Sequence, residues 1–574
     1  MAIQKVSDMM IEVLEQAGVQ HCYGIVGDTL NHFTDSLSKS SIEWVHVRHE
    51  EVGAFAAGAD SLMSGNLTVC AGSCGPGSLH FINGLYESHR NRAPVVLIAS
   101  QLSTEQAGYL DFPQYVDFKP IYQSCSVYCE EIKAASQVRH IMTLACQAAI
   151  NQRGVAVVIM PTNISEQYVD AGLPFKVHHP KPEMIPSQQE LNEIKELINC
   201  NQKVTIYAGI GSQDAHDQVV ELAKKLKAPV VHTSRAKDFI EHNNPYNLGM
   251  NGMYGNKSAI HGITHSEVLL LLGTDFAWPQ FYPKHAKIIQ IDVDATHLGR
   301  RYPVEVGAVG HIAPTLKALL PLVNEKQDAS FLDECLKLKK VADEVRRKEE
   351  RIGKDGLIHP QYVAALINKY ADDDDAFFTG DAGSSKLWML RHIDTNGKRR
   401  TLCSLLHGTM ANSMPQALGI KKAFPDRQVI ALCGDGGLAM LLGDLLTIVQ
   451  EKLPIKIVVI NNHSLNFVEL EQKIDGLLDN YTHLLNPDFG KVAESMGIFG
   501  MTQKTGEGLE EAIQKFLAHD GPALIDIYTN PVELVMPPET SFEQVKSTSI
   551  YAMKAILAGR VDDVKDLIVN NFVK

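Results

Sequence analysis

VIALCGDGGLAML, residues 429–441, and IKIVVINNHSLNFV, residues 455–468, are two apolar runs that each lead into small or polar residues. The segment between them is long enough for a helix, so the stretch predicts one β-helix-β unit. The carboxyl ends of neighbouring parallel strands meet at one edge of a sheet, and we expect Asp435 and Asn462 to meet there. A carboxylate and an amide oxygen suit a cation such as Mg²⁺, and the glycines allow backbone N–H groups to approach phosphates. Either motif alone is also typical of a surface turn, so the prediction of a cation and diphosphate site depends on both.

Similar apolar runs alternate with helical patterns along the chain of 574 residues. Such unbroken runs predict parallel strands that are covered on both faces, and therefore the α/β class. The expected strands are Val95–Ala99, Val155–Met160, Val204–Ala208, Val268–Leu272, Ile288–Ile291, Val429–Leu432, Ile457–Ile460 and Leu524–Tyr528. Breaks in the pattern predict three consecutive parallel-sheet domains at 1–182, 183–334 and 335–530, followed by a short helical tail at 531–574.

Composition excludes some classes of function. The net charge of −14 argues against nonspecific nucleic-acid binding. No apolar run reaches membrane-spanning length. The ten cysteines are scattered, which predicts reduced and mostly buried thiols.

Three motifs together resemble the family of thiamine diphosphate (ThDP) enzymes. They are RHEEVGAFAAGAD at 48–60, GPG at 75–77, and the GDG and NN motifs of the opening stretch. The resemblance implies ThDP and Mg²⁺ as cofactors and gives Glu50 the role of activating the aminopyrimidine ring. Without the resemblance, Glu50 and Glu51 would be read as acidic residues that favour a helix N-terminus.

The resemblance also assigns residues of the third domain. Met410 is implied to wedge between the two ThDP rings, although simple core packing would explain it equally well. Asp435, Asn462 and Ser464 are implied as metal ligands. The expected ThDP contacts are Glu50, Gly408, Thr409, Met410, Asp435, Gly436, Gly437, Asn462, His463, Ser464, Leu465, Asn466, Phe467 and Val468.

The middle domain resembles the FAD-binding domain of pyruvate oxidases. The segments that carry the resemblance are NLGMNGMYGN at 247–256, LLGTDFAW at 271–278 and IIQIDVD at 288–294. The alternative is a middle domain without a nucleotide, in which these polar residues only cap strand ends. The expected FAD contacts are Asn251, Gly252, Met253, Tyr254, Thr274, Asp275, Phe276, Ala277, Trp278 and Asp292.

Over most of its length the chain resembles the quinone-linked branch of ThDP- and FAD-dependent pyruvate oxidases. The resemblance implies that pyruvate is oxidised to acetate and CO₂ and that FAD passes electrons to membrane ubiquinone or menaquinone. Phe467 and Gln114 are implied at the substrate site with Glu50, although Pro113 stands where the family has phenylalanine. Glu50 and Asp435 lie on different domains, and the family builds its site between two chains, so we expect at least a dimer and a homotetramer as the full assembly.

The tail has apolar stripes, including Ile550, Met553, Ile556 and Leu557, which favour a helix docked on the body. The resemblance instead implies a lipid-binding tail on a lipid-activated enzyme, at the inner face of a bacterial membrane. The alternatives are a phosphate-dependent pyruvate oxidase that makes acetyl phosphate with O₂, an acetolactate synthase, and a non-catalytic membrane-associated regulator. Intact Glu50, Asp435 and Asn462 argue against the regulator.

Overall fold

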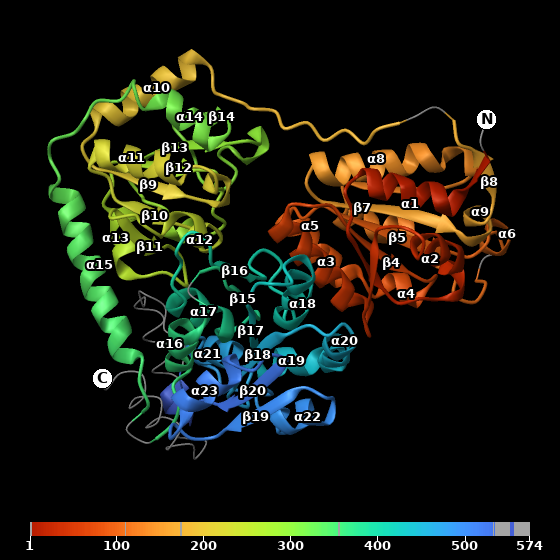
Figure 1. Cartoon of the computed structure of the whole chain (residues 1–574). Helices are drawn as coiled ribbons and strands as arrows, with labels where there is room; N and C mark the ends of the chain where they lie inside the picture. Colours follow the sequence, from red (N-terminus) through yellow and green to blue (C-terminus); the bar gives the residue numbers. More distant parts are fainter. Residues whose placement is uncertain are drawn as a thin grey trace.

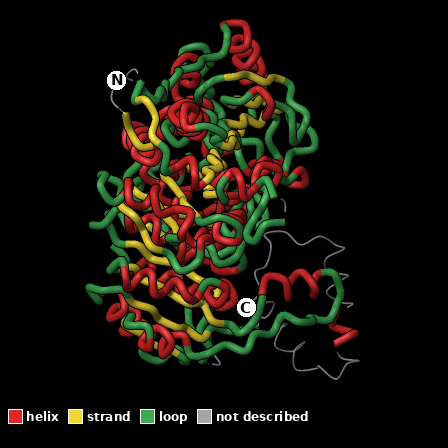
Figure 2. The backbone as a smooth tube through the Cα atoms, turned by 90° about the vertical axis from the view of Figure 1, so that its right-hand side faces the viewer, coloured by secondary structure: helices red, strands yellow, loops and turns green. Residues whose placement is uncertain are grey.

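The computed structural model describes residues 3–109, 111–172, 175–353, 356–372, 374–531, 533 and 551–555. This part of the chain contains three six-stranded parallel sheets, each in its own domain (Figure 1). A separate antiparallel pair joins β1 (Ile3–Lys5) to β8 (Tyr168–Asp170). Seen from the side, the strands lie among helices from one end of the molecule to the other (Figure 2). The predicted class, three parallel-sheet α/β domains, is confirmed.

The N-terminal sheet has the strand order β3-β2-β4-β5-β7-β6. Its central strands are fully buried, because helices cover both faces. The strands are β2 (His21–Gly24), β3 (Glu43–His46), β4 (Thr68–Gly72), β5 (Val95–Gln101), β6 (Tyr128–Glu131) and β7 (Val155–Pro161). The helices are α1 (Val6–Gln16), α2 (Asn31–Leu37), α3 (Glu50–Ser64), α4 (Pro76–Leu79), α5 (Ile82–Asn91), α6 (Thr104–Ala107), α7 (Phe118–Tyr122), α8 (Val138–Asn151) and α9 (Thr162–Ser165).

The middle sheet has the order β11-β10-β9-β12-β13-β14. In this doubly wound order β10 and β11 follow β9 on one side, and β12, β13 and β14 follow on the other side. Ligands of such sheets bind at the switch point, which lies between β9 and β12. The strands are β9 (Val204–Ala208), β10 (Val230–His232), β11 (Asn247–Met250), β12 (Val268–Leu272), β13 (Lys287–Asp292) and β14 (Val306–Val309). The helices are α10 (Gln188–Cys200), α11 (His216–Leu226), α12 (Lys237–Ile240), α13 (Lys257–Thr264) and α14 (Ile312–Leu319).

The C-terminal sheet has the order β16-β15-β17-β18-β20-β19, so its topology repeats that of the N-terminal sheet. The strands are β15 (Phe377–Gly380), β16 (Arg400–Cys403), β17 (Val429–Gly434), β18 (Ile455–Asn461), β19 (Phe499–Gln503) and β20 (Ala523–Tyr528). The helices are α16 (Pro360–Tyr370), α17 (Ser384–His392), α18 (Ser413–Ala423), α19 (Asp435–Met440), α20 (Leu445–Gln450), α21 (Asn466–Ile474), α22 (Phe489–Ser495) and α23 (Leu509–Leu517).

All eight strands that we expected from apolar runs are present, with ends shifted by at most a few residues. One expected domain boundary falls inside a helix. The long helix α15 (Ser330–Glu349) crosses the expected boundary at 334, because its first turns pack on the middle domain (Figure 1).

Helix α3 of the N-terminal domain packs closely against α18 of the C-terminal domain. A Cβ added at Gly419 would stand 2.0 Å from the carbonyl oxygen of Ala56, so the two backbones nearly touch. One apolar core includes side chains of both domains, among them Val52, Phe55, Ala417 and Leu418. The two domains are therefore joined within one chain.

Of the predicted tail, 531–574, the structure describes residues 531, 533 and 551–555, and the last group forms a helical turn. Tyr551 and Ala555 are buried in the core of the C-terminal domain, and Lys554 Nζ donates to the carbonyl oxygen of Gly476 at 2.7 Å. Of the predicted stripe residues Met553 is described, and its side chain is 60% exposed. The other stripe residues lie outside the described part of the chain. Within the described part of the chain, no helix is long and apolar enough to cross a membrane.

Candidate active site

The opening stretch brings its two polar ends together at one edge of the C-terminal sheet. Gly434 at the end of β17 pairs in register with Ile460 of β18. The buried Asp435 carboxylate accepts a hydrogen bond from the backbone N–H of His463, next to Asn462. Asn486 Nδ2 also donates to Asp435 Oδ2 at 2.8 Å. The predicted meeting of Asp435 with the Asn462 loop is therefore present, while metal binding stays a prediction.

Burial raises the pKa of Asp435, and its hydrogen-bond donors oppose that rise. A cation at this edge would favour the ionised carboxylate in the same way. Among the described residues, no three His, Cys, Asp or Glu side chains gather as a metal site. Protein-bound Mg²⁺ commonly takes only one or two carboxylates together with substrate phosphates and water. The single carboxylate here fits that pattern.

Two glycines leave room beside this edge. Gly383 and Gly408 have positive φ angles of 120° and 77°, and a Cβ added at either would meet no atom of the described residues within 4 Å. No side chain therefore fills the space beside these glycines, which leaves room for a phosphate. The Met410 side chain reaches the same place, with its Cε 3.4 Å from a Cβ added at Gly436. These residues fit the diphosphate and the bent ring system of ThDP.

A buried acid that we did not predict as a site residue fixes this edge. Asp381 follows β15 and accepts from the backbone N–H groups of Ser413 at 2.8 Å and Gly434 at 3.2 Å. It thereby links the start of α18, three residues after Met410, to the GDGG loop. Burial raises the pKa of Asp381 to about 7.

The remaining residues of the 462–468 segment divide between the loop and α21. Asn462 Oδ1 accepts from the backbone N–H of Ser464 at 3.1 Å, and Ser464 Oγ donates to Glu469 at 2.5 Å. The backbone N–H of Leu465 donates to the carbonyl oxygen of Thr482 at 2.8 Å. Phe467 is half-buried against the core of the C-terminal domain. The last two residues of the prediction are Asn466, which is buried, and Val468, which is exposed.

Glu50 lies at a second strand edge, in the N-terminal domain. It is the first residue of α3 and only 6% exposed. Its Oε2 lies 2.9 Å from His80 Nδ1, and its Oε1 would stand 3.4 Å from a Cβ at Gly77 in the GPG loop. Glu51 instead accepts from Asn83 Nδ2 at 2.6 Å. The two adjacent glutamates therefore have different hydrogen-bond partners.

Gln114 packs against the GPG loop at 75–77. Its Cα and Cβ are 3.2 and 3.1 Å from a Cβ added at Gly75, and Cys74 Sγ donates to its Oε1 at 3.6 Å. Gln114 is exposed and Phe112 is half-buried. Gln114 therefore lies beside the GPG loop, and its place at the substrate site stays a prediction.

Within one chain, side chains of the N-terminal domain form hydrogen bonds to the loop that carries Met410. Asn83 binds His407 Nε2 at 2.8 Å and Thr409 Oγ1 at 3.0 Å. Ser404 Oγ donates to the buried Glu87 at 2.6 Å and accepts from the backbone N–H groups of Gly408 and Thr409. Burial raises the pKa of Glu87. Loop 404–410 is thus positioned by both domains.

Predicted nucleotide residues of the middle domain lie along the carboxyl edge of its sheet. Thr274 follows β12, Asp292 ends β13 and Asn251 follows β11. Asn251 is 2% exposed, and its Oδ1 has no hydrogen-bond partner among the described residues. A buried amide oxygen without a donor is costly, so a donor from a ligand would stabilise it. This edge fits a bound nucleotide such as FAD.

Other residues of that prediction have protein partners. Asp275 forms ion pairs with Arg300 and Arg301. The Phe276 ring covers Gly252, whose φ is 92°. Lys386 Nζ lies 5.2 Å from the centre of the Tyr254 ring. The last three residues are Met253, which is half-buried, and Ala277 and Trp278, which are exposed.

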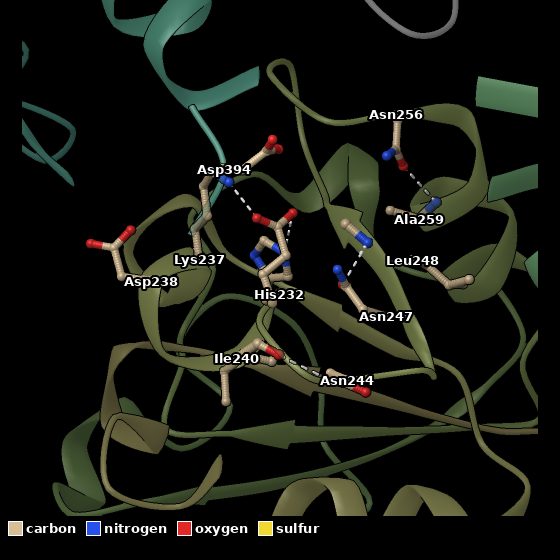
Figure 3. A network of polar contacts seen from close by, with 12 residues as sticks. His232, Lys237, Asp238, Ile240, Asn244, Asn247, Leu248, Asn256, Ala259 and Asp394 are labelled. Carbon is tan, nitrogen blue, oxygen red and sulfur yellow. Dashed lines mark hydrogen bonds and ion pairs between the residues drawn. The ribbon is translucent and has the colours of Figure 1, made fainter. Parts of the chain in front are cut away.

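The turn beyond β10 anchors the middle domain to the C-terminal domain. His232 ends β10, and Lys237 and Asp238 begin α12 on the other side of this turn (Figure 3). Asp238 accepts from the backbone N–H of Thr401 at 2.6 Å and from its hydroxyl at 2.9 Å. Burial raises the pKa of Asp238 to about 6. The turn is held by its own bonds, such as that from Asn244 to the Ile240 carbonyl (Figure 3).

Fold and site define a three-domain α/β protein in which Asp435 and the Asn462 loop meet at one strand edge and the buried Glu50 lies in a separate domain. Family comparisons agree. The chain matches the N-terminal TPP binding domain, the central domain and the C-terminal TPP binding domain of thiamine pyrophosphate enzymes at residues 4–121, 191–319 and 381–527. The chain belongs to the thiamine pyrophosphate enzyme family.

Three relatives cover nearly the whole chain. The thiamine pyrophosphate-containing protein YdaP of Bacillus subtilis is 33% identical over 96% of this chain and 96% of its own length. A pyruvate oxidase of Lactiplantibacillus plantarum is 30% identical over 90% of this chain and 87% of its own. An acetolactate synthase of Mycobacterium bovis is 28% identical over 92% of this chain and 88% of its own.

Proposed function

We propose that this chain oxidises pyruvate to acetate and CO₂ and passes the electrons through FAD to a membrane quinone. The observation that carries the proposal is the carboxyl edge of the middle-domain sheet, where the buried Asn251 Oδ1 has no donor among the described residues and where Thr274 and Asp292 also lie. A ThDP decarboxylase needs no second nucleotide. A built nucleotide edge beside a ThDP site supports a reaction that also transfers electrons.

The cofactors would divide the chemistry: ThDP supplies an electron sink for loss of CO₂, and FAD accepts two electrons. The residues of the chain would position the cofactors and exchange protons with them. Asp435 and Asn462 would hold the cation that carries the diphosphate. Glu50, buried beside His80, can share a proton with the aminopyrimidine ring. Met410, fixed through loop 404–410, would hold the two rings in their bent shape.

Purified protein tested with pyruvate in the absence of O₂ checks the proposal. We expect flavin absorption bands at about one FAD per chain, loss of those bands when pyruvate is added, and their return when a soluble ubiquinone analogue is added. Acetate should be the product. Protein without flavin, or flavin that pyruvate does not reduce, would contradict the proposal.

Two other outcomes would identify the alternatives. The first alternative is an acetolactate synthase, which the relationship to such enzymes supports and which acetolactate as the main product would establish. The second is a phosphate-dependent pyruvate oxidase, which is indicated if turnover requires phosphate and O₂ and yields acetyl phosphate. Either result would keep the ThDP site and reject the quinone.

Quinone reduction would bring the protein to a membrane, and we propose that it acts at the inner face of a bacterial membrane through its tail. The docked turn at 551–555 supports a tail that starts on the C-terminal domain. A homotetramer remains part of the same proposal.

A further inference from the structure

A chain of hydrogen bonds crosses from the N-terminal domain to the middle domain and ends on Asp292. Arg92 Nη2 lies 2.7 Å from His297 Nε2, and His297 Nδ1 lies 3.0 Å from Asp292 Oδ1. His297 is 4% exposed and Asp292 is 5% exposed. Two buried polar groups at the proposed nucleotide edge are thus tied to a residue of another domain.

The donors in this chain fix the position of the histidine proton. A guanidinium group can only donate, so His297 Nε2 must accept from Arg92. The imidazole is therefore neutral, with its proton on Nδ1, and that N–H donates to Asp292. Without Arg92 the proton can move to Nε2, because Nε2–H can then donate to Asp294 Oδ2, which lies 3.4 Å away. Arg92 therefore selects the tautomer that serves Asp292.

Two donors then hold one oxygen of Asp292. Oδ1 accepts from His297 Nδ1–H and from the backbone N–H of Asp294 at 3.1 Å. Among the described residues, no donor reaches Oδ2. An acid at a strand end of a doubly wound sheet accepts from ribose hydroxyls. Fixing Oδ1 leaves Oδ2 as the acceptor for the ribose.

We propose that Arg92 and His297 are a positioning pair for the nucleotide half of FAD, so that docking of the N-terminal domain sets how tightly the middle domain holds FAD. This inference rests on the proposed function, because it takes FAD as the ligand of Asp292.

The local backbone supports a fixed Arg92. Arg92 ends α5 with φ of 61°, a conformation that a non-glycine residue keeps only where its surroundings determine it. Its backbone N–H bonds to the carbonyl oxygen of His89 at 3.0 Å. A second contact follows the same seam, from Arg235 Nη2 of the middle domain to the carbonyl oxygen of Asn91 at 3.4 Å.

Two substitutions of His297 separate the two bonds. His297→Asn places an amide N–H near the position of Nδ1 and keeps the donor to Asp292, but it lacks the acceptor for Arg92. His297→Gln places an amide oxygen near the position of Nε2 and keeps the acceptor, but it lacks the donor. FAD release from diluted holoprotein, followed by the gain in flavin fluorescence, reports on Asp292. Hydrogen exchange of residues 86–94 reports on the domain seam.

We expect His297→Gln to weaken FAD binding about tenfold, as loss of one hydrogen bond to a charged group does, with exchange at the seam unchanged. His297→Asn should hold FAD nearly as tightly as the wild type but exchange faster at the seam. Arg92→Met should weaken FAD binding and speed exchange. Added to His297→Asn, Arg92→Met should change FAD release no further.

Equal FAD loss in the Asn and Gln variants, or normal FAD release from Arg92→Met, would overturn the positioning pair. Asp292→Asn separates this failure from failure of the proposed function. If Asp292→Asn weakens FAD binding while the Arg92 and His297 variants behave as wild type, only the pair is wrong. If Asp292→Asn holds FAD normally, or the purified protein carries no flavin, the FAD role of Asp292 is wrong and the pair with it.

Discussion

At the scale of single residues, the adjacent Glu50 and Glu51 offer a matched test of the activating acid. Glu50 pairs with His80, whereas Glu51 pairs with Asn83. Glu50→Gln should lower pyruvate turnover at least about 100-fold, because removing a positioned proton donor or acceptor costs about 10²–10⁴ in rate. Glu51→Gln can still accept from Asn83 and should stay within a few-fold of wild type. Steady-state kinetics and flavin content measure both variants, and FAD should stay bound.

Near-normal turnover by Glu50→Gln would contradict its role. Equal loss in both variants would indicate that the start of α3 is disturbed rather than that one proton is lost. Thermal unfolding of both proteins separates these outcomes.

The sequence identified residues whose motifs have fixed spacing, but not the residues that hold them. Asp435 and Asn462 follow two strands of one β-helix-β unit, so their meeting was predictable. Asn486, which donates to Asp435, comes from a loop farther along the chain with no periodic pattern. The contact of His80 with Glu50 likewise depends on how α4 folds back after the GPG turn.

At the scale of elements, Asp381 couples β15, β17 and α18, and its titration should be visible in stability. Burial raises its pKa from 3.8 to about 7, so the folded state binds this proton more tightly than the unfolded state does. As pH rises from about 4 to 7 the unfolded state loses the proton first, and the free energy of unfolding must fall. Above that window both states are ionised and the contribution stays constant. The non-titrating Asp381→Asn variant lacks this fall.

The free energy of unfolding of the wild type, relative to that of Asp381→Asn, should therefore fall between about pH 5 and 7 and become constant by about pH 8. Urea unfolding midpoints across that range measure it. A difference that does not change with pH would show that Asp381 keeps an ordinary pKa.

The crossing of α3 and α18 is a second test at this scale. Gly419→Ala would place a Cβ 2.0 Å from the carbonyl oxygen of Ala56, which belongs to rigid helix backbone. We expect a loss of about 1–3 kcal/mol in unfolding free energy, as for overpacked cores. Gly443→Ala is the control, because a Cβ there meets no atom within 4 Å, and its effect should stay within about 0.5 kcal/mol. Equal midpoints for the two variants in urea unfolding would mean that the helices can separate freely.

Strands were predictable at this scale because buried parallel strands are continuous apolar runs, as Val268–Leu272 illustrates. The order of the strands was not, since it depends on contacts between segments far apart in sequence. The α3–α18 crossing shows the same limit: the small residues of α3 suit close packing, but nothing in the sequence identifies Gly419 as the partner.

At the scale of the whole molecule, the tail divides into a docked turn and the residues beyond it. Tyr551 and Ala555 belong to the core of the C-terminal domain, so removal of residues 556–574 should leave the body folded. If the tail binds lipid, this truncation should keep pyruvate turnover with a soluble electron acceptor and lose stimulation by anionic phospholipid vesicles. Truncation from Tyr551 is the contrasting variant and should also lower the thermal unfolding temperature, because it removes buried side chains. Lipid stimulation of the protein that lacks 556–574 would show that the tail is not the lipid-binding part.

Assembly decides whether one chain or two complete the active site. Within one chain the N-terminal domain holds loop 404–410 through Asn83 and Glu87, yet Glu50 pairs with His80 of its own domain. If each site takes Glu50 from one chain and Asp435 from its partner, co-expressed Glu50→Gln and Asp435→Asn chains should regain activity. Half of a random population of two-fold dimers is mixed, and each mixed dimer has one intact site, so activity should return to about a quarter of wild type. Sites built within one chain cannot recover, because every chain carries one defect. Two-tag purification isolates the mixed dimers, whose pyruvate turnover should therefore be about half of wild type, and no gain over the parent variants would contradict a site shared between chains.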